Sequence, residues 1–240
     1  KLPNINLYID PISHDGGTAI GLAKLAWYIH TKEHITEPLK TIYLRSHPSY
    51  NKLHTILKTT KIKALDITSK QIAELISNKN IVAIFQGRSE GGPRALGNRS
   101  ILFDPRIEDG KQIVNSIKGR EWFRPFAASI MEEYANEWFE MQGIESSPYM
   151  MYAVNCKDGI AEKIPSIIHV DGTCRIQTVT KEQNGHYYDL INAFYKKTGV
   201  PIVFNTSFNL GGDPLVETLD DAVDTLSRSD IEYLYLPELK

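Results

Sequence analysis

The chain has 240 residues, of which 42% are hydrophobic and 23% charged, and its formal net charge is −2. This composition is typical of a globular protein with a real core, and it argues against a protein that coats nucleic acid or binds membranes through basic charge. No apolar run approaches the roughly 20 residues that a membrane-spanning helix needs, and the two cysteines, Cys156 and Cys174, indicate free thiols in a reducing cytoplasm.

The first 65 residues carry few structural signals. Residues 5–9 are typical of a short strand, and residues 16–30 of a Gly-rich turn that enters a helix. Residues 31–65 are polar and weakly patterned, which indicates a connector. Because the chain opens on lysine and not methionine, we expect further sequence upstream of it.

From residue 66 onward, short apolar runs alternate with amphipathic segments. Strands are predicted at residues 81–85, 100–103, 126–131, 149–155, 167–179, 200–209 and 233–237. Helices are predicted after a capping box that begins at Thr68 and at residues 110–118, 132–140, 187–199 and 218–229. This alternation predicts an α/β fold with a mixed sheet.

An arginine-rich turn, "FQGRSEGGPRALGNRSILFDPR", follows the first of these strands. Six of the nine arginines lie between residues 88 and 124: Arg88, Arg94, Arg99, Arg106, Arg120 and Arg124. Planar guanidinium groups suit the oxygens of phosphate or carboxylate, and glycines let the backbone approach a ligand closely. Structural arginines that bind carbonyl groups are the alternative. The grouping of so many like charges favours a bound polyanion.

Two other polar turns are candidate sites. "HVDGTCRIQTV" places Asp171 and Arg175 beside a strand, and "FNTSFNLGGDP" places Asn205, Ser207 and Asn209 at the end of one. Ligands in α/β folds commonly lie beyond strand ends, although an ordinary polar turn is also possible in each case. His14 and Asp15 precede a helix, where such residues act as caps more often than as metal ligands. His169 is typical of a hydrogen-bonded core histidine.

These segments, together with "KGREWFRPFAAS", "SPYMMYAV" and "TGVPIVFNTSFNLGGDPLVET", resemble in content and order the carbamoyltransferases of the nodulation and antibiotic-tailoring type. The resemblance runs from about residue 81 to residue 236. It implies a YrdC-like domain with a twisted mixed sheet and flanking helices over residues 66–240. It also implies that residues 1–40 are the remnant of an actin-like ATPase (Kae1-like) domain, joined by a connector at residues 41–65.

The resemblance implies that the C-terminal domain binds ATP, with Mg²⁺, and carbamoyl phosphate. The domain would form carbamoyl adenylate, and the carbamoyl group would then pass to a hydroxyl of an unidentified acceptor near an iron ion. By motif, Arg94, Lys118, Arg124 and Arg175 correspond to the catalytic residues, and Asp15 to a metal ligand. Arg88, Arg99, Asn205, Ser207 and Asn209 correspond to nucleotide or carbamoyl contacts, with a structural role equally open for Arg88, Arg99 and Asn205.

One departure from the family limits this reading, because the paired histidines that complete the iron site are not in this chain. We therefore expect that these residues alone support adenylate formation at most. Two alternatives stay open: a YrdC-like module that binds nucleotide or RNA without turnover, and the related threonylcarbamoyl-adenylate synthase. The near-neutral charge makes nucleic acid the weaker candidate partner.

Overall fold

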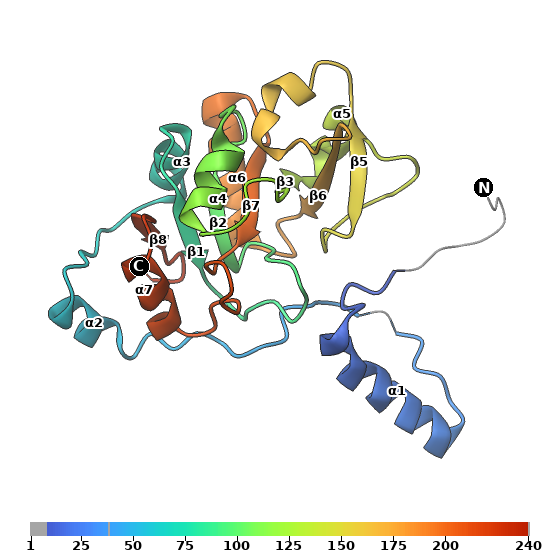
Figure 1. Cartoon of the computed structure of the whole chain (residues 1–240). Coiled ribbons are helices and arrows are strands. Elements are labelled where there is room, and N and C mark those ends of the chain that lie inside the picture. Colours follow the sequence, from blue (N-terminus) through green and yellow to red (C-terminus); the bar gives the residue numbers. More distant parts are fainter. Residues whose placement is uncertain (1–8, 38, 240) are drawn as a thin grey trace.

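The computed structural model describes residues 9–37 and 39–239, and an eight-stranded sheet forms its centre (Figure 1). The strand order is β4-β5-β6-β3-β7-β2-β1-β8. The strands are β1 (Val82–Phe85), β2 (Arg99–Phe103), β3 (Ala127–Met131), β4 (Phe139–Glu140), β5 (Tyr152–Cys156), β6 (Thr173–Val179), β7 (Ile202–Ser207) and β8 (Tyr233–Tyr235). The predicted strand at residues 5–9 lies almost wholly outside the described residues.

The sheet is mixed, as predicted. Strand β3 pairs in parallel with β6 and antiparallel with β7, while β1 pairs in parallel with β8 and antiparallel with β2. Every residue of β1, β2 and β3 is buried. Continuous burial explains why these strands are mostly apolar in sequence and do not alternate between apolar and polar residues, with Arg99, Ser100 and Ser129 as the polar exceptions.

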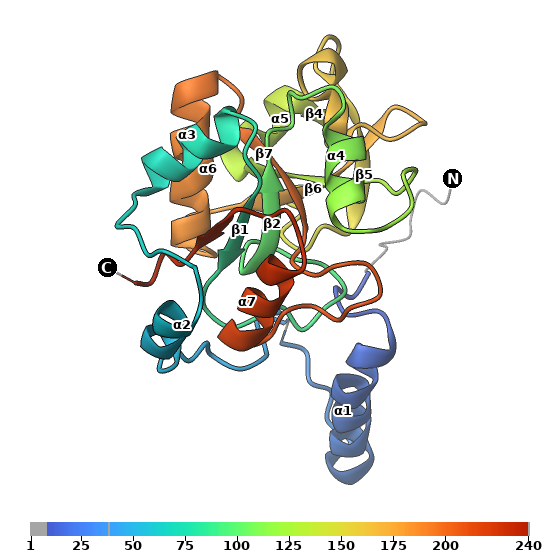
Figure 2. The same ribbon diagram turned by 60° about the vertical axis from the view of Figure 1, so that its left-hand side comes forward.

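The described residues contain seven α-helices, some of which cover the two faces of this sheet. They are α1 (Thr18–Thr31), α2 (Leu53–Thr59), α3 (Ser69–Ser77), α4 (Gly110–Ile117), α5 (Ala135–Trp138), α6 (Gly185–Thr198) and α7 (Leu219–Ser227). Helices α3 and α6 pack together on one face, and α4 lies on the other (Figures 1 and 2). The predicted capping box is present: Thr68 accepts from the backbone of Gln71, whose side chain accepts from the backbone of Thr68.

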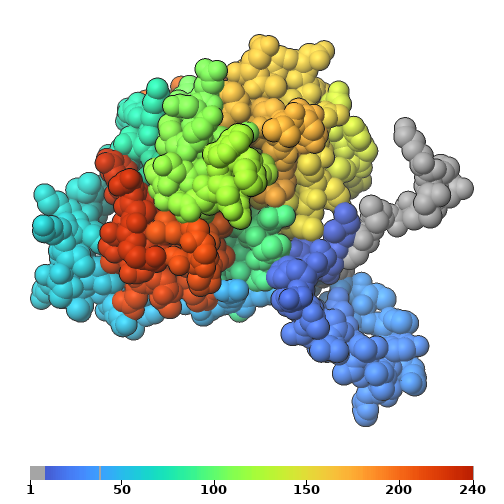
Figure 3. Space-filling model, viewed as in Figure 1, coloured from blue at the N-terminus to red at the C-terminus, as the bar shows by residue number. Residues whose placement is uncertain are grey.

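The N-terminal helix α1 projects away from the sheet (Figure 3). None of its residues is buried, and its large apolar side chains are open to solvent, with Leu22 at 59% and Ile29 at 60% exposure. The connector that follows is mostly irregular and contains only α2. Its residues 42–44 nevertheless lie against the core, where Ile42 is 1% exposed and its carbonyl accepts from Gly91 at 2.6 Å. The division at residues 1–40, 41–65 and 66–240 stays a prediction.

Two predicted elements are wrong in their limits. The helix expected at residues 132–140 is broken into a 3-10 turn (Glu132–Tyr134), the single turn of α5, and β4. The strand expected from residue 167 begins only at Thr173, because a turn intervenes: His169 donates its N–H to the carbonyl of Thr173 at 2.8 Å, and Gly172 has φ +81°. Apolar residues alone did not reveal either break.

None of the helices within residues 9–37 and 39–239 has the length and apolarity needed to cross a bilayer. Both cysteines are free. Burial raises the pKa of Cys156 to about 11, and it raises the pKa of Cys174 further, so neither thiol is an activated nucleophile.

Candidate functional site

Three adjacent strands place the predicted site residues in one row across the sheet. In β3, Ala127 pairs on one side with Arg175 of β6 and on the other with Asn205 of β7. The loop that precedes β3 carries Arg120 and Arg124, so it leads into the sheet between Arg175 and Asn205. Segments far apart in the chain therefore meet at one end of these strands.

The arginine-rich turn lies over this row, and a carboxylate that belongs to the turn stabilises its shape. The buried carboxylate of Glu90 accepts from the N–H groups of Leu96, Asn98 and Arg99 at 2.6, 3.0 and 3.3 Å. Burial raises the pKa of Glu90. Because three backbone donors depend on this one carboxylate oxygen, Glu90 shapes the turn that carries Arg94.

Side chains of β6 and β7 attach the same turn to the sheet. Asn205 donates to the carbonyl of Ala95 at 3.0 Å, and Gln177 donates to the carbonyl of Leu96 at 3.0 Å. Ser129 of β3 joins Asn205 and Gln177 through hydrogen bonds of 2.9 and 2.7 Å. This buried polar group fixes the position of the turn beside Arg175.

Five cationic side chains gather at this edge, and we call them the cation cluster: Arg94, Lys118, Arg120, Arg124 and Arg175. Burial and the charges of Arg94 and Arg120 lower the pKa of Arg175 to about 10. Burial and the charge of Arg124 lower the pKa of Arg120 to about 10, and burial and the charge of Arg120 lower the pKa of Lys118 to about 7. The interactions are between neighbours: Arg175 interacts with Arg94 and Arg120, and Arg120 interacts with Lys118 and Arg124.

The cation cluster has few counter-charges. In the part of the chain that the structure describes, only Arg124 of the five forms an ion pair, with Glu121 at 2.7 Å. The Nε atoms of Arg94 and Arg175 and the Nη2 atom of Arg120 are buried without a hydrogen-bond partner, and so is Oδ1 of Asn205. Buried charged donors without partners are unfavourable unless an anion binds them. The cluster therefore has the chemistry of a polyanion site.

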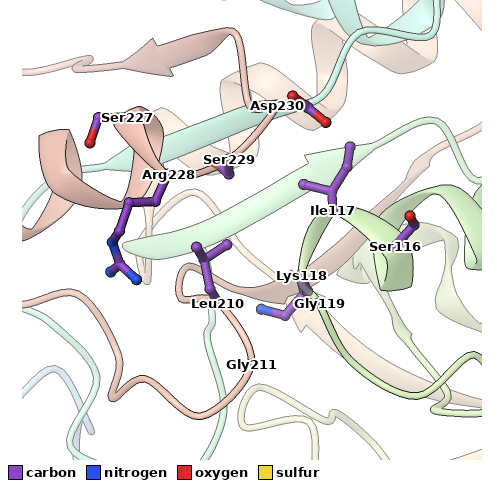
Figure 4. Close-up of a pocket in the computed structure, with 10 residues that line it drawn as sticks. All are labelled: Ser116, Ile117, Lys118, Gly119, Leu210, Gly211, Ser227, Arg228, Ser229 and Asp230. Carbon is purple, nitrogen blue, oxygen red and sulfur yellow. The ribbon is translucent and has the colours of Figure 1, made fainter.

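Lys118 lies at the end of α4 and binds the turn after β7 (Figure 4). Its ammonium donates to the carbonyl of Ser207, to the carbonyl of Asn209 at 2.7 Å and to Oδ1 of Asn209 at 3.1 Å. Ser207 in turn donates from its hydroxyl to Oδ1 of Asn209 at 2.6 Å. Lys118, Ser207 and Asn209 thus form one hydrogen-bonded unit beside the cation cluster.

A cavity of about 600 Å³ adjoins this unit, between the C-terminal ends of α4 and α7 (Figure 4). Lys118 is the only member of the cation cluster that lines it. Gly211, whose N–H donates to the carbonyl of Lys118 at 2.6 Å, lies beside it, and Arg228 also lines the cavity. The unpartnered buried nitrogens of Arg94, Arg120 and Arg175 lie outside this lining.

The comparison with known families agrees with this geometry. The family model described as "Carbamoyltransferase C-terminus" matches residues 73–240. The chain belongs to the carbamoyltransferase family. The resemblance noted in the sequence is therefore confirmed.

Relatives and one solved structure extend this result. The carbamoyltransferase chain is 37% identical over 236 residues to nodulation protein NolO of Bradyrhizobium diazoefficiens, covering 95% of this chain and 43% of that protein. It is 38% identical over 238 residues to nodulation protein NolNO of Sinorhizobium fredii, covering 95% and 35%. It thus spans less than half the length of these relatives.

Full-length HypF in a phosphate- and nucleotide-bound form has the same fold at a TM-score of 0.52 and 16% identity, over 71% of this chain and 25% of that one. The predicted α/β class, with flanking helices on a mixed sheet, is confirmed.

Two of the expected contact residues of this carbamoyltransferase chain are engaged by its own backbone. Arg88 donates to the carbonyls of Leu44 and Arg45, both at 2.6 Å. Arg99 is 0% exposed, donates to the carbonyls of Gln86, Gly87, Asn98 and Glu217, and lies 3.9 Å from the centroid of the Phe85 ring. The structural role that the sequence left open accounts for these contacts.

Asp15 does not lie in a metal site within the described residues. It is exposed in a 3-10 turn (Asp15–Gly17), which His14 caps by accepting from Gly16 at 3.1 Å. No group of three or more His, Cys, Asp or Glu residues that could hold a metal ion occurs in residues 9–37 and 39–239. Asp15 as a metal ligand, and iron in a longer protein, stay predictions, and we derive no step from either. His169 is hydrogen-bonded to Thr173 and Phe126, as expected for a core histidine.

Sequence reasoning missed Arg120 as a member of the site. It counted this residue among the clustered arginines, but the family motif directed attention to Lys118 and Arg124 on either side. Its position in the sequence could have indicated this role, because Arg120 lies two residues after Lys118, at the end of a predicted helix. Glu90 and Gln177 were also missed, since a carboxylate and an amide inside a turn or strand carry no distinctive pattern.

The lowered pKa of Lys118 allows a prediction of how pH affects anion binding. Its pKa of about 7 lies well below the ordinary lysine value of about 10.4, because burial opposes the charged form. A bound polyanion favours the ammonium, so at a pH above about 7 binding should take up a proton and affinity should fall as pH rises. By the same reasoning, this residue adds to the free energy of unfolding as pH rises from about 7 to about 10, where the unfolded chain binds more protons.

Calorimetry with ATP between about pH 7.5 and about pH 8.5 tests this expectation. In this range the phosphates of ATP are almost fully ionised, and Arg120 and Arg175, with pKa values of about 10, keep their charge. We expect up to a tenfold loss of affinity per pH unit and an uptake approaching one proton, measured in buffers of different ionisation enthalpy. In Lys118→Met both the slope and the proton uptake should disappear. An affinity of the unaltered chain that rises with pH would contradict the assignment.

Proposed function

We propose that residues 66–240 form an adenylating domain that binds ATP and carbamoyl phosphate and makes carbamoyl adenylate for transfer to a hydroxyl group. Membership of the carbamoyltransferase family supports the carbamoyl group as the substrate unit. The observation that carries the proposal is the cation cluster, whose buried donors lack protein partners at the meeting point of β3, β6 and β7. The phosphate and nucleotide present in the HypF structure are consistent with this fold holding such ligands.

The proposed reaction needs alignment and charge neutralisation more than a protein nucleophile. Water converts carbamoyl phosphate to carbamate and inorganic phosphate. One carbamate oxygen then attacks the α-phosphorus of ATP and expels pyrophosphate, leaving carbamoyl adenylate. Each step places negative charge on phosphate oxygens, which fixed guanidinium groups stabilise without reorganisation.

Residue roles follow from position within the site. Arg94 and Arg175, which have unpartnered buried Nε atoms, would bind the phosphate oxygens. Arg124, exposed and paired with Glu121, would exchange that partner for a ligand oxygen. Ser207 and Asn209, held by Lys118, would line the nucleotide or carbamoyl side of the site. Mg²⁺ would accompany ATP, as at other phosphate-transfer sites. The acceptor hydroxyl, and transfer to it, would depend on parts that the longer relatives have and this chain does not span.

An exchange assay tests the proposal directly. The chain, incubated with ATP, Mg²⁺ and labelled pyrophosphate, should incorporate label into ATP only when carbamoyl phosphate is present. Binding of ATP without any exchange would favour a non-catalytic nucleotide-binding module. Exchange that requires threonine and bicarbonate in place of carbamoyl phosphate would favour the threonylcarbamoyl type of activity.

A further inference from the structure

Two neighbouring residues of the predicted connector hold both ends of the short loop that carries Arg94. The carbonyl of Ile42 accepts from the backbone N–H of Gly91 at 2.6 Å, at the start of this loop. The hydroxyl of Tyr43 donates to the carbonyl of Leu96 at 2.9 Å, at its end. The loop forms neither helix nor strand, so contacts with other segments determine its course.

The same two segments also pack closely together. Ile42 and Leu96, both 1% exposed, belong to a small apolar cluster that includes Ala127, the first residue of β3. A Cβ atom on Gly91 would lie 3.3 Å from the carbonyl oxygen of Ile42 and 3.2 Å from the Cβ atom of Leu44. The connector backbone therefore lies so near the loop that a side chain at position 91 would have little space.

A second hydrogen bond fixes the hydroxyl of Tyr43. The side-chain amide of Asn184, which caps α6, donates to this hydroxyl at 3.4 Å. Because a hydroxyl has only one proton, a hydroxyl that accepts from Asn184 keeps its proton for the carbonyl of Leu96. Gln177 of β6 donates to the same carbonyl, so the loop is held from the sheet and from the connector together.

A carboxylate just before α7 attaches this part of the connector, residues 42–46, to the arginine-rich turn. We call these residues the strap. Glu217 accepts from the backbone N–H of Ser46 at 3.2 Å and from its hydroxyl, and it also accepts from the hydroxyl of Ser89 at 2.5 Å. Arg88 donates to two carbonyls of the strap. Both ends of the strap are thus bound to the turn.

The position of Arg94 depends on this loop. Its Nε is buried and has no hydrogen-bond partner in the described residues, so the Nε does not fix the guanidinium by a bond of its own. The guanidinium can then meet an anion in the right geometry only if the loop backbone is held in place. A displacement of about 1 Å at such a site can cost about 100-fold in rate.

We propose that Tyr43 is a positioning residue for Arg94: its hydroxyl, carried by the strap, holds the loop in the conformation in which Arg94 meets the anion. The inference rests on the proposed function, because ATP supplies that anion. Tyr43 does not touch the ligand and acts only through Arg94. A segment that the sequence indicated as a connector thereby takes part in the reaction.

The first test is the affinity of the 240-residue chain for ATP, measured by calorimetry at constant pH and salt. Tyr43→Phe removes the hydroxyl and keeps the ring, and we expect affinity to fall by about 3- to 10-fold, the loss typical of one neutral hydrogen bond. Tyr50→Phe is the matched control, because Tyr50 lies in the same connector and its hydroxyl donates to Glu238. It should change affinity less than about twofold.

A double-mutant cycle shows whether Tyr43 acts through Arg94. In an Arg94→Ala background, Tyr43→Phe should weaken ATP binding less than about threefold, because the guanidinium that the loop positions is absent. Titration with ATP in large excess keeps the weakened binding measurable. If Tyr43 supports only the fold, a loss of about threefold or more should persist in this background, and that outcome overturns the positioning role.

The outcomes separate this inference from the proposed function. If the unaltered chain does not bind ATP, the proposed function fails, and this inference fails with it. If the unaltered chain binds ATP and Tyr43→Phe binds within about threefold of it, only this inference is overturned. Should Tyr43→Phe lose cooperative unfolding, Glu217→Ala takes its place, because it releases the strap at Ser46 and keeps Tyr43. Affinity should then still fall at least about threefold, and a smaller loss overturns the inference.

Discussion

Replacing Arg94 by alanine should lower carbamoyl-phosphate-dependent ATP–pyrophosphate exchange by about two to three orders of magnitude, the range seen when a pre-organised charge-stabilising donor is removed. Arg94 is half-buried, its Nε has no partner in the described residues, and it faces the charge of Arg175. Its loss therefore removes a contact to the ligand and leaves no internal bond broken. The measurement is the initial rate of label exchange at saturating substrates.

The fold should survive this change, and a melting curve should show it. Since burial lowers the pKa of Arg94 and no ion pair offsets its charge, Arg94→Ala should leave the melting temperature unchanged or raise it slightly. Arg94→Lys retains the charge without the planar fork and should recover only part of the rate. A folded Arg94→Ala variant with an unaltered exchange rate would remove Arg94 from the site.

Replacing Gly97 by alanine should destabilise the chain by about 4 kcal/mol, as the sum of overpacking and backbone strain. Gly97 has φ +101°, and a Cβ atom there would lie 2.2 Å from Cδ1 of Tyr187, whose side chain is 0% exposed. Its carbonyl and N–H also bond Gln86 and Ser100. Neither the ring nor the backbone has room to move.

Urea denaturation of Gly97→Ala beside Gly119→Ala separates the two causes. Gly119 also has a positive φ, +61°, but a Cβ atom there meets nothing within 4 Å. Gly119→Ala should therefore cost only the strain, about 1 kcal/mol. Equal losses in the two variants would show that the contact between residue 97 and Tyr187 is not as close as described.

Much of the fold could be predicted because its central strands are buried on both faces. Residues 81–85 are apolar throughout and residues 126–131 are apolar except for Ser129, and few other arrangements accommodate such runs. The errors lie where tertiary contacts override local pattern. The turn before β6 depends on His169 and Gly172, and the short α5 ends at a strand that pairs with Cys156 of β5. The apolar residues of α1 predicted a helix correctly, but their pattern did not indicate that they would be exposed.

The motifs that form the candidate site could be predicted from the sequence, but the hydrogen-bond partners of its individual side chains could not. The sequence indicates that Arg94, Lys118, Arg124 and Arg175 belong together, and the structure places them at one edge of the sheet. It could not separate Arg99, which donates to four backbone carbonyls, from Arg120, which donates from its Nε to the side chain of Asn115. Each of the two arginines also has one buried nitrogen without a partner in the described residues. That difference in partners depends on which carbonyls lie within reach after folding, and no spacing along the chain encodes it.

The position of β3 between β6 and β7 has a consequence for how the molecule matures. The side chains near Ala127, the first residue of β3, come from segments as far apart in the chain as Arg94 and Asn209. They come together only when β3 has paired with both β6 and β7. Under the proposed function, a partly folded chain would have no site for a nucleotide. Binding of the substrate would then stabilise only the completed sheet.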